Sequence, residues 1–245
     1  MKPFSATELR VPPNITTAHP DAIIRRLLPT AIAVVEGAIP DPPDPIWPEE
    51  SASVRNAVPK RAREFAAGRA FARRALGILG ISPGPLPAKP DRSPLWPPGF
   101  VGSVTHASDY CAVAVARTTD VSAIGIDVEE LERFDPIFVE QIFSPIEMRL
   151  HVPATTPREL RRLGALIFSA KEAIYKCLST VAEVRLSFRD CTVQLEHEAG
   201  AFAMIVPATA RIFAADQCIA GRFAFAGTLV GTAVILPPAP RYAGE

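Results

Sequence analysis

Proline divides this chain into short structured segments. The sequence has 26 prolines among 245 residues, and this is about twice the ~5% that is usual in proteins. Many of them gather in three stretches, residues 39–50, 81–99 and 236–245. Because proline has no backbone N–H and a fixed φ angle, we predict that these stretches are extended connections. Helices and strands are then expected in the segments between them.

Composition and charge exclude several classes of protein. The apolar share is 48% and 26 basic residues balance 26 acidic ones, so no overall field attracts nucleic acid or an anionic membrane. No apolar run is long enough to span a bilayer, and residues 1–14 lack the pattern of a secretory signal. The 4 cysteines form no C-x-x-C pair, which argues against a zinc site or a disulfide framework. We therefore expect a cytoplasmic protein that binds neither nucleic acid nor membrane.

Hydrophobic periodicity predicts an α+β fold. Helices are expected at residues 20–28, 50–80, 134–151 and 157–179, the third of them broken at Ser144-Pro145. Strands are expected at residues 30–37, 100–118 (two strands joined by a turn), 122–132, 186–196, 201–207, 218–227 and 228–236, the last four as an antiparallel meander. Helix and strands are thus followed by helix and strands again, an order that indicates two α+β lobes.

The helix expected at residues 50–80 carries many of the basic side chains. At ~100° per residue, one of its faces is apolar and contains Phe65, Ala72, Leu76 and Leu79. Arg63, Arg73 and Arg74 are predicted to lie on a solvated face. For Arg61 and Arg69 a solvated position and a binding role both stay open.

Asp127 and Glu129 lie two residues apart in the strand expected at residues 122–132. Their carboxylates therefore project from the side of the strand opposite to that of Ile124, Ile126 and Val128. Carboxylate oxygens are ligands of hard cations such as Mg²⁺, and phosphate oxygens often complete the shell. A half-buried strand with an acidic edge is the alternative explanation, and the D-x-E pattern alone favours it.

Residues 168–176, FSAKEAIYK, place two lysines and a glutamate on the helix expected at residues 157–179. Glu172 and Lys176 are four residues apart with the glutamate first, so a surface ion pair explains them fully. The functional alternative makes Glu172 a third oxygen ligand or a general base, and the lysines Lys171 and Lys176 phosphate contacts. Alone, the segment favours the ion pair.

Residues 102–106, GSVTH, offer backbone N–H groups and the His106 imidazole to a phosphate. A single histidine is more often structural, so this segment is ambiguous by itself. The order and spacing of the three segments are specific, however. GSVTH, GIDVE (125–129) and FSAKEAIYK (168–176) resemble the G-S-x-[ST]-H, G-[IV]-D-[IVA]-E and [FW]-[SC]-x-K-E-[AS]-x-x-K motifs of two-lobed 4′-phosphopantetheinyl transferases. The stretch PLWPPGFVGSVTH (94–106) is most similar to the enterobactin-synthetase branch.

The resemblance covers roughly residues 55–190 and implies both a fold and a reaction. The fold would consist of two similar α+β lobes related by a pseudo-twofold axis, residues 1–123 and 124–245, with coenzyme A in the cleft. The reaction would move the phosphopantetheine arm of coenzyme A to a serine of an apo acyl, peptidyl or aryl carrier protein and release 3′,5′-ADP. The chain is long enough to act as a monomer. Whether the pathway makes a siderophore, a polyketide or a fatty acid stays open.

The resemblance also assigns site residues. Asp127, Glu129 and Glu172 correspond to the ligands of Mg²⁺, or of Mn²⁺, and Glu172 is also the candidate base. Lys176 would neutralise phosphate charge, and Lys171 would help to bind it.

Ser103 and His106 match the family's pyrophosphate position. Arg61 and Arg69 fall where the family contacts the 3′-phosphate, a task that suits a bidentate guanidinium. One departure concerns the proline-rich loop, where Ala88 occupies a position that is often basic. Either Lys89 or Arg92 is then expected to substitute, or binding on the adenine side is weaker.

Two other functions compete with this one. A different Mg²⁺-dependent phosphoryl or nucleotidyl enzyme would use the same carboxylates, but the sequence has no G-x-x-x-x-G-K-[ST] and no G-x-G-x-x-G motif. A non-catalytic module that binds carriers or senses coenzyme A is disfavoured by the intact carboxylates and lysines. The apolar segment FDPIFVEQIF (134–143) is either a carrier-docking surface or an ordinary core-facing helix.

Overall fold

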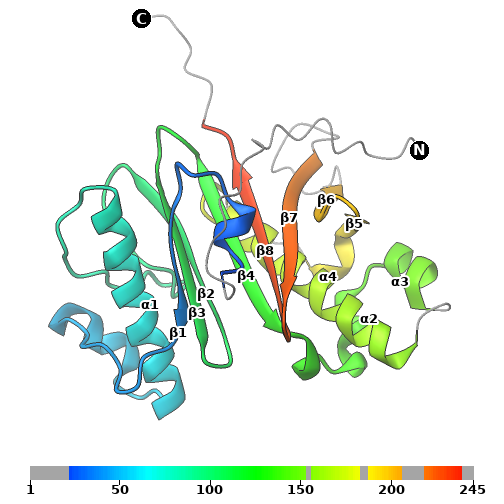
Figure 1. Cartoon of the computed structure of the whole chain (residues 1–245), viewed down its shortest axis with the longest axis horizontal. Coiled ribbons are helices and arrows are strands. Elements are labelled where there is room, and N and C mark those ends of the chain that lie inside the picture. The colour runs from blue at the N-terminus through cyan, green and yellow to red at the C-terminus, as the bar shows by residue number, and fades with distance from the viewer. Residues whose placement is uncertain (1–21, 153–155, 183–186, 206–217, 239–245) are drawn as a thin grey trace, which may run out of the picture.

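The computed structural model describes residues 22–152, 156–182, 187–205 and 218–238 (Figure 1). Its strands form two antiparallel sheets, one of three strands in the order β1-β3-β2 and one of five in the order β4-β8-β7-β6-β5. The strands are β1 (Ala33–Ala38), β2 (Phe100–Ala107), β3 (Tyr110–Arg117), β4 (Ala123–Glu130), β5 (Thr192–Glu196), β6 (Ala201–Ile205), β7 (Cys218–Ala226) and β8 (Leu229–Leu236). The predicted α+β class is confirmed, as is the meander of the last four strands. The division into lobes at residue 123 stays a prediction.

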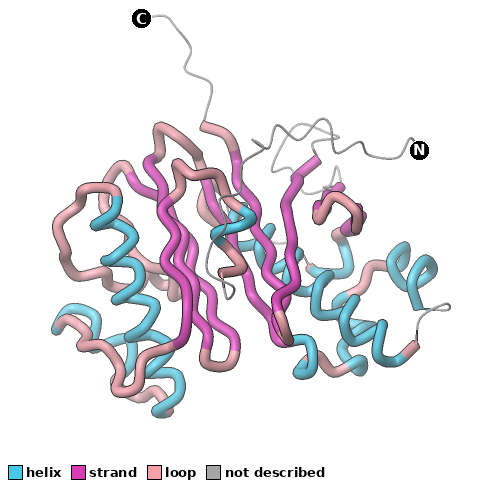
Figure 2. Tube along the Cα trace, viewed as in Figure 1, coloured by secondary structure: helices cyan, strands magenta, loops and turns pink. Residues whose placement is uncertain are grey.

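The helices are α1 (Pro59–Ile78), α2 (Val139–Ile142), α3 (Pro145–His151) and α4 (Pro157–Leu178), and short 3₁₀ turns lie at Arg25–Leu27, Pro48–Val54, Leu131–Arg133, Pro136–Phe138 and Phe188–Asp190. In Figure 2 the strands fill the middle of the molecule, with helices at both ends. The break predicted at Ser144-Pro145 is confirmed, because Ser144 caps α3 and Pro145 begins it. Among the described residues, no helix is long and apolar enough to cross a membrane.

α1 covers the first sheet and forms the core of that half of the molecule. Its buried stripe, which includes Ala72 and Leu76, packs against Cys111, Val113 and Val115 of β3, as its periodicity predicts. The expected solvated position is wrong for Arg73. Its guanidinium pairs at 2.7 Å with the fully buried carboxylate of Glu50.

α4 covers the second sheet, and Ala173, Ile174 and Cys177 lie in the core between them. Thr156 and Glu159 form a capping box at its first turn. The helix comes close to β4 because Gly125 has no side chain. A Cβ at Gly125 would lie 1.8 Å from the carbonyl oxygen of Ala173.

The two sheets meet where β2 lies beside β4, and side chains rather than a backbone ladder join them. Ser103 Oγ accepts a hydrogen bond from the Ile126 N–H at 3.1 Å. Thr105 Oγ1 accepts one from the Val128 N–H at 3.1 Å. The alternating serine and threonine of GSVTH therefore fix one half of the molecule against the other.

The face of β4 opposite to Asp127 and Glu129 is apolar. Ile124, Ile126 and Val128 are buried there, together with Ile24 of the N-terminal segment, so the predicted alternation along β4 is confirmed. The helix expected at residues 20–28 is shorter in the structure, a 3₁₀ turn at Arg25–Leu27. Residues 20 and 21 lie outside the described residues. The carboxylate of Glu36 accepts hydrogen bonds from the N–H groups of residues 23–25 and so caps the turn.

Candidate active site

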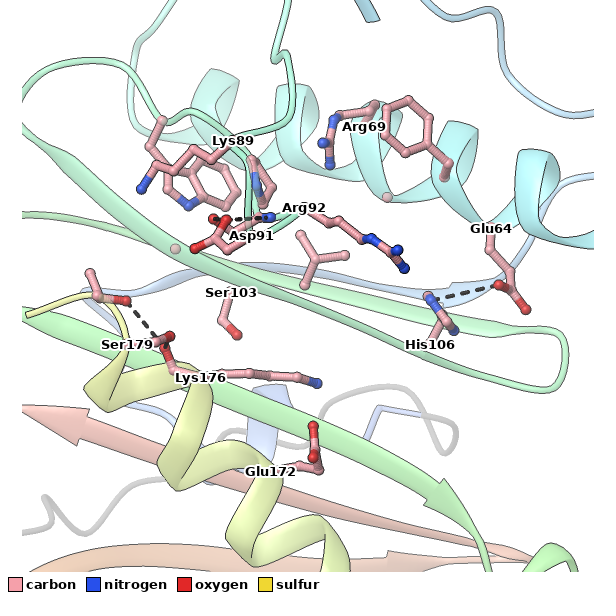
Figure 3. A pocket seen from close by; sticks show the side chains of 18 of the residues that line it. Glu64, Arg69, Lys89, Asp91, Arg92, Ser103, His106, Glu172, Lys176 and Ser179 are labelled. Atoms are coloured by element: carbon pink, nitrogen blue, oxygen red, sulfur yellow. Dashed lines mark hydrogen bonds and ion pairs between the residues drawn. The ribbon is translucent and has the colours of Figure 1, made fainter. Parts of the chain in front are cut away.

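A cavity of about 310 Å³ lies between α1, β2 and α4, with the proline-rich loop at one side (Figure 3). It is lined by most of the residues that the sequence singles out, which come from four different segments of the chain: Arg61 and Arg69 from α1, Lys89 and Arg92 from the loop, Ser103 and His106 from β2, and Glu172 and Lys176 from α4. Cationic side chains thus face a carboxylate across one cavity.

Arg69 provides the most buried positive charge of this cavity. It is 3% exposed, its Nε donates to the carbonyl of Leu86 at 2.6 Å, and its guanidinium lies 4.3 Å from the centre of the Phe65 ring. Burial lowers its pKa to about 10, so it stays charged at neutral pH. No described residue accepts a hydrogen bond from Nη2, although that atom is buried. A buried guanidinium with an unused donor leaves a position for a hydrogen-bond acceptor, and that Arg69 binds an anion stays a prediction.

The loop after α1 brings two further cations to the cavity. An antiparallel bridge between Ala88 and Pro94 closes the loop, and Arg92 at its tip has a φ of 69°. Lys89 and Arg92 both line the cavity and are exposed. That either of them substitutes for the cation missing at Ala88 stays a prediction.

Arg61, Arg69, Lys89 and Arg92 form one side of the cavity, called here the cationic wall. His106 lies in a polar cluster beside it. Arg61 Nη1 is 2.7 Å from His106 Nε2, and Glu64 Oε2 is 3.6 Å from the same nitrogen. Burial lowers the pKa of His106, and the carboxylate of Glu64 opposes that effect. Glu64 belongs to none of the three motifs, so the sequence alone does not point to it. Its position one turn after Arg61, on the same face of α1, is the signal that would have found it.

Asp127 is 3% exposed and, like Glu129, does not line the cavity, but it contacts Lys176, which does. Lys176 Nζ donates to Asp127 Oδ1 at 2.6 Å, and Thr105 Oγ1 donates to the same oxygen at 3.2 Å. The surface pair expected between Glu172 and Lys176 is therefore replaced by an ion pair between Lys176 and Asp127. No described residue donates to Asp127 Oδ2, which is buried.

Three carboxylates influence one another here. Burial raises the pKa of Glu129 to about 8, with further increases from Asp127 and Glu172 and a decrease from Lys176. Burial also raises the pKa of Glu172, Lys176 opposes the rise, and Asp127 adds to it. Like charges in a desolvated corner favour either a proton or a cation.

These carboxylates are ligands of the type that Mg²⁺ prefers, but they are not arranged around one metal position. Among the described residues, no group of three His, Cys, Asp or Glu side chains is arranged to hold a metal ion. The buried Asp127 Oδ2, which lacks a donor in the described part of the chain, is an open position for a hard cation. Asp127 therefore fits a ligand role, and Glu129 and Glu172 are its nearby carboxylate neighbours.

Two predicted contacts differ from their expected positions. Lys171 lies outside the cavity, because it is one position before Glu172 on α4 and points towards α2 and α3. Its ammonium pairs with Glu147 at 2.7 Å. The prediction that Lys171 helps to bind phosphate is therefore corrected. Ser103 does line the cavity, but its hydroxyl is already used at the seam with Ile126.

Comparisons with known proteins identify the family of this chain. Residues 45–116 match the family model for the 4′-phosphopantetheinyl transferase N-terminal domain, and residues 123–224 match the model for the 4′-phosphopantetheinyl transferase superfamily. The curated protein 4′-phosphopantetheinyl transferase Svp of Streptomyces mobaraensis is 36% identical over 204 residues, which are 82% of this chain and 80% of that protein. The chain belongs to the 4′-phosphopantetheinyl transferase superfamily.

Other relatives of this transferase include members of the enterobactin branch. The 4′-phosphopantetheinyl transferase PptT of Mycobacterium tuberculosis is 36% identical over 149 residues, 61% of this chain and 65% of that protein. Enterobactin synthase component D of Salmonella typhimurium is 32% identical over 139 residues, 56% of each chain. A solved structure, holo-[acyl-carrier-protein] synthase of Thermotoga maritima, aligns with 48% of this chain and 64% of its own, at 25% identity and a TM-score of 0.37. The family resemblance predicted from the three motifs is confirmed, and so is the prediction of an enzyme that acts on coenzyme A and carrier proteins.

Proposed function

We propose that this transferase moves the phosphopantetheine arm of coenzyme A to a serine hydroxyl of an acyl, peptidyl or aryl carrier protein, in the presence of Mg²⁺ or Mn²⁺, and releases 3′,5′-ADP. The observation that carries the proposal is the opposition of charge across one cavity. Arg69 lines this cavity and supplies a buried N–H without a described acceptor. Glu172 and Lys176 line it from α4, and Lys176 pairs with Asp127, whose buried Oδ2 has no described donor. A phosphoanhydride with a bound cation satisfies both.

The cationic wall would hold the coenzyme. Arg61 and Arg69, with Lys89 or Arg92 from the loop, would bind the 3′-phosphate and the adenine side. His106, beside Arg61, would contact the pyrophosphate. Such fixed contacts accelerate phosphoryl-type transfer chiefly by orienting the reacting groups and stabilising their charge.

The three carboxylates of Asp127, Glu129 and Glu172, called here the acidic corner, would activate the serine hydroxyl of the carrier. Asp127, Glu129 and Glu172 would hold the Mg²⁺, which when bound supplies charge neutralisation at the pyrophosphate. Because burial raises the pKa of Glu172, this carboxylate holds a proton more tightly than an exposed glutamate and suits removal of the serine proton. Lys176 lines the same cavity as Glu172 and would neutralise charge on the phosphate of the leaving 3′,5′-ADP.

The carrier would dock beside this corner, on the segment 134–143. Three of its residues, Val139, Ile142 and Phe143, are buried. Two apolar side chains are open to solvent, with Ile137 70% and Phe138 48% exposed. Exposed apolar side chains of this kind suit a transient protein partner. We place the reaction in the cytoplasm, with the chain acting as a monomer.

The acidic corner can be tested with isosteric amides. Asp127→Asn and Glu172→Gln should each lower kcat by ~10²-fold or more, because a cation ligand or a general base is lost. Asp120→Asn, on an exposed turn, is the matched control. Release of 3′,5′-ADP would be followed by liquid chromatography with saturating coenzyme A, Mg²⁺ and apo carrier. Near-normal turnover in either site variant would refute the assignment of that carboxylate.

A further inference from the structure

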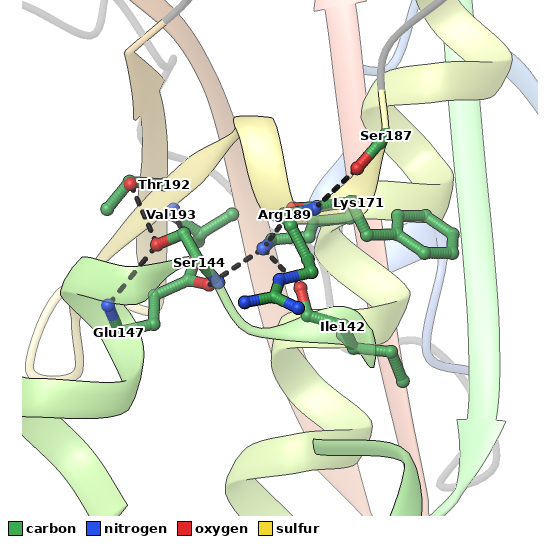
Figure 4. A network of polar contacts seen from close by, with 9 residues as sticks. Ile142, Ser144, Glu147, Lys171, Ser187, Arg189, Thr192 and Val193 are labelled. Atoms are coloured by element: carbon green, nitrogen blue, oxygen red, sulfur yellow. Dashed lines mark hydrogen bonds and ion pairs between the residues drawn. The ribbon is translucent and has the colours of Figure 1, made fainter. Parts of the chain in front are cut away.

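Lys171 is fully buried in a polar network that the reaction described above does not use (Figure 4). It is 3% exposed, and its ammonium makes three contacts: with Glu147 Oε2 at 2.7 Å, with the Ile142 carbonyl at 2.8 Å and with the Phe188 carbonyl at 2.8 Å. A lysine ammonium has three N–H donors. All three are therefore used inside the protein, and none is left for a phosphate.

Glu147 connects the same network to β5 and to the start of its own helix, α3. It is 0% exposed, and its Oε1 accepts from the Val193 N–H of β5 at 2.7 Å. Its Oε2 accepts from the Ser144 N–H at 2.6 Å, at the start of α3. Ser144 Oγ also lies 2.9 Å from Thr192 Oγ1. The ion pair thus fixes α2, α3 and β5 to one point on α4.

That point is adjacent to the candidate base. Lys171 immediately precedes Glu172, which lies about 100° further round the helix and faces the cavity. Lys171 also binds Ile142, the last residue of α2 and part of the segment 134–143. One side chain therefore links the apolar segment to the catalytic turn of α4.

We propose that Lys171 is a positioning residue for the carrier-protein half of the reaction, and that its ion pair with Glu147 holds the segment 134–143 at a fixed distance from Glu172. The inference rests on the proposed transfer to a carrier and on docking at this segment. The two lysines of FSAKEAIYK then have different roles. Lys176 serves the coenzyme, and Lys171 serves the acceptor.

The separation follows from where the two ammonium groups lie. Lys176 lines the cavity between α1 and α4 and contacts Asp127. Lys171 has no place in that cavity, and burial lowers its pKa while Glu147 opposes the decrease. Removing the Lys171 ammonium should thus change how the carrier serine approaches, without changing the cavity residues that bind coenzyme A. Misplacement by ~1 Å is enough to cost up to ~100-fold in rate.

The matched pair Lys171→Met and Lys176→Met tests this on one helix with one chemical change. Coenzyme A affinity would be measured by isothermal titration calorimetry, and kcat and KM by transfer to an apo carrier, well below the melting temperature. For Lys171→Met we expect a Kd for coenzyme A within ~2-fold of wild type and a kcat/KM for the carrier lowered by ~10-fold or more. For Lys176→Met we expect the Kd for coenzyme A to rise.

Several results would overturn the proposal. If Lys171→Met weakens coenzyme A binding as much as Lys176→Met does, Lys171 is a coenzyme contact. If it leaves the carrier kcat/KM unchanged, the ion pair serves stability alone. Should Lys171→Met not fold, the milder Glu147→Gln decides by the same two criteria. Wild-type protein that binds coenzyme A but transfers nothing would refute the proposed function itself, and the inference with it.

A double variant tests the coupling directly. If Lys171 acts through the docking segment, Lys171→Met and Phe138→Asp together should lower the carrier kcat/KM by less than the product of their separate effects. Effects that multiply would show that the two residues act independently, and this result would overturn the link.

Discussion

Substituting alanine for Gly125 should both destabilise the protein and disable the site. Gly125 lies on β4 where α4 comes closest, and an added Cβ would lie 1.8 Å from the Ala173 oxygen, 2.7 Å from the Cys177 nitrogen and 2.8 Å from the Cys177 Cβ. Real Cβ contacts are essentially never shorter than 3.0 Å. Two of these three atoms belong to the backbone, so no side-chain rotation relieves the clash, and α4 must move by roughly 1 Å away from the strand.

The size of both effects follows from that shift. Overpacking of a core costs ~1–3 kcal/mol of unfolding free energy, and contact with backbone atoms places Gly125→Ala at the upper end. For a protein of this size, the melting temperature should fall by about 5–10 °C. Because Ala173 is next to Glu172 on α4, a shift of ~1 Å also separates Glu172 from Asp127 and should lower kcat by up to ~100-fold.

Differential scanning calorimetry and steady-state transfer kinetics would measure the two effects. Gly77→Ala is the matched control, because Gly77 lies in α1 and an added Cβ there meets nothing within 4 Å. That control should keep full activity and gain up to ~1 kcal/mol from its helix propensity. A Gly125→Ala protein with the wild-type melting temperature and kcat would refute the close packing of α4 on β4.

Three other predictions concern the site. Arg69→Leu should raise the KM for coenzyme A by ~10-fold or more, because a buried charged contact is lost. Arg74→Leu, on the exposed face of α1, should leave this KM unchanged. If the two variants have the same KM, Arg69 has only a structural role. Thr105→Val removes a donor to Asp127 and should lower both kcat and, by ~1–3 kcal/mol, the unfolding free energy; unchanged stability would contradict the bridge between the sheets. Because burial raises the pKa of Glu129 from 4.5 to about 8, the folded metal-free protein binds that proton more tightly than the unfolded chain, so stability should fall as pH rises between these values. Glu129→Gln should flatten this fall in melting temperature, and an identical pH profile in the variant would contradict the assigned environment.

Local periodicity was sufficient to predict the elements that carry the site. The alternation along β4 places Asp127 and Glu129 opposite Ile126, and the amphipathic pattern of residues 157–179, with a proline at its start, predicts α4 to within a residue of its end. The spacing of the three motifs was enough to predict the family. Both signals depend on residues that are close in sequence, where geometry leaves few choices.

The partners of buried charges could not be predicted in the same way. Helical spacing places Lys171 about 100° from Glu172 but does not say which side of α4 is covered. Glu147, 24 residues earlier, decides that point, since it supplies the buried charge that Lys171 needs. Arg73 is a similar case, because its partner Glu50 lies on a separate 3₁₀ turn. Such pairs depend on tertiary packing, which the periodicity of one segment does not contain.

The proposed reaction of this transferase is metal-dependent transfer of phosphopantetheine to a carrier protein. Its most direct test is the intact mass of an apo carrier after incubation with this protein, coenzyme A and Mg²⁺, with EDTA in a parallel sample. We predict a gain of one phosphopantetheine group, abolished by EDTA and restored by excess Mg²⁺. Binding of coenzyme A without a mass gain on acyl, peptidyl or aryl carriers would contradict the account and favour a module that senses coenzyme A.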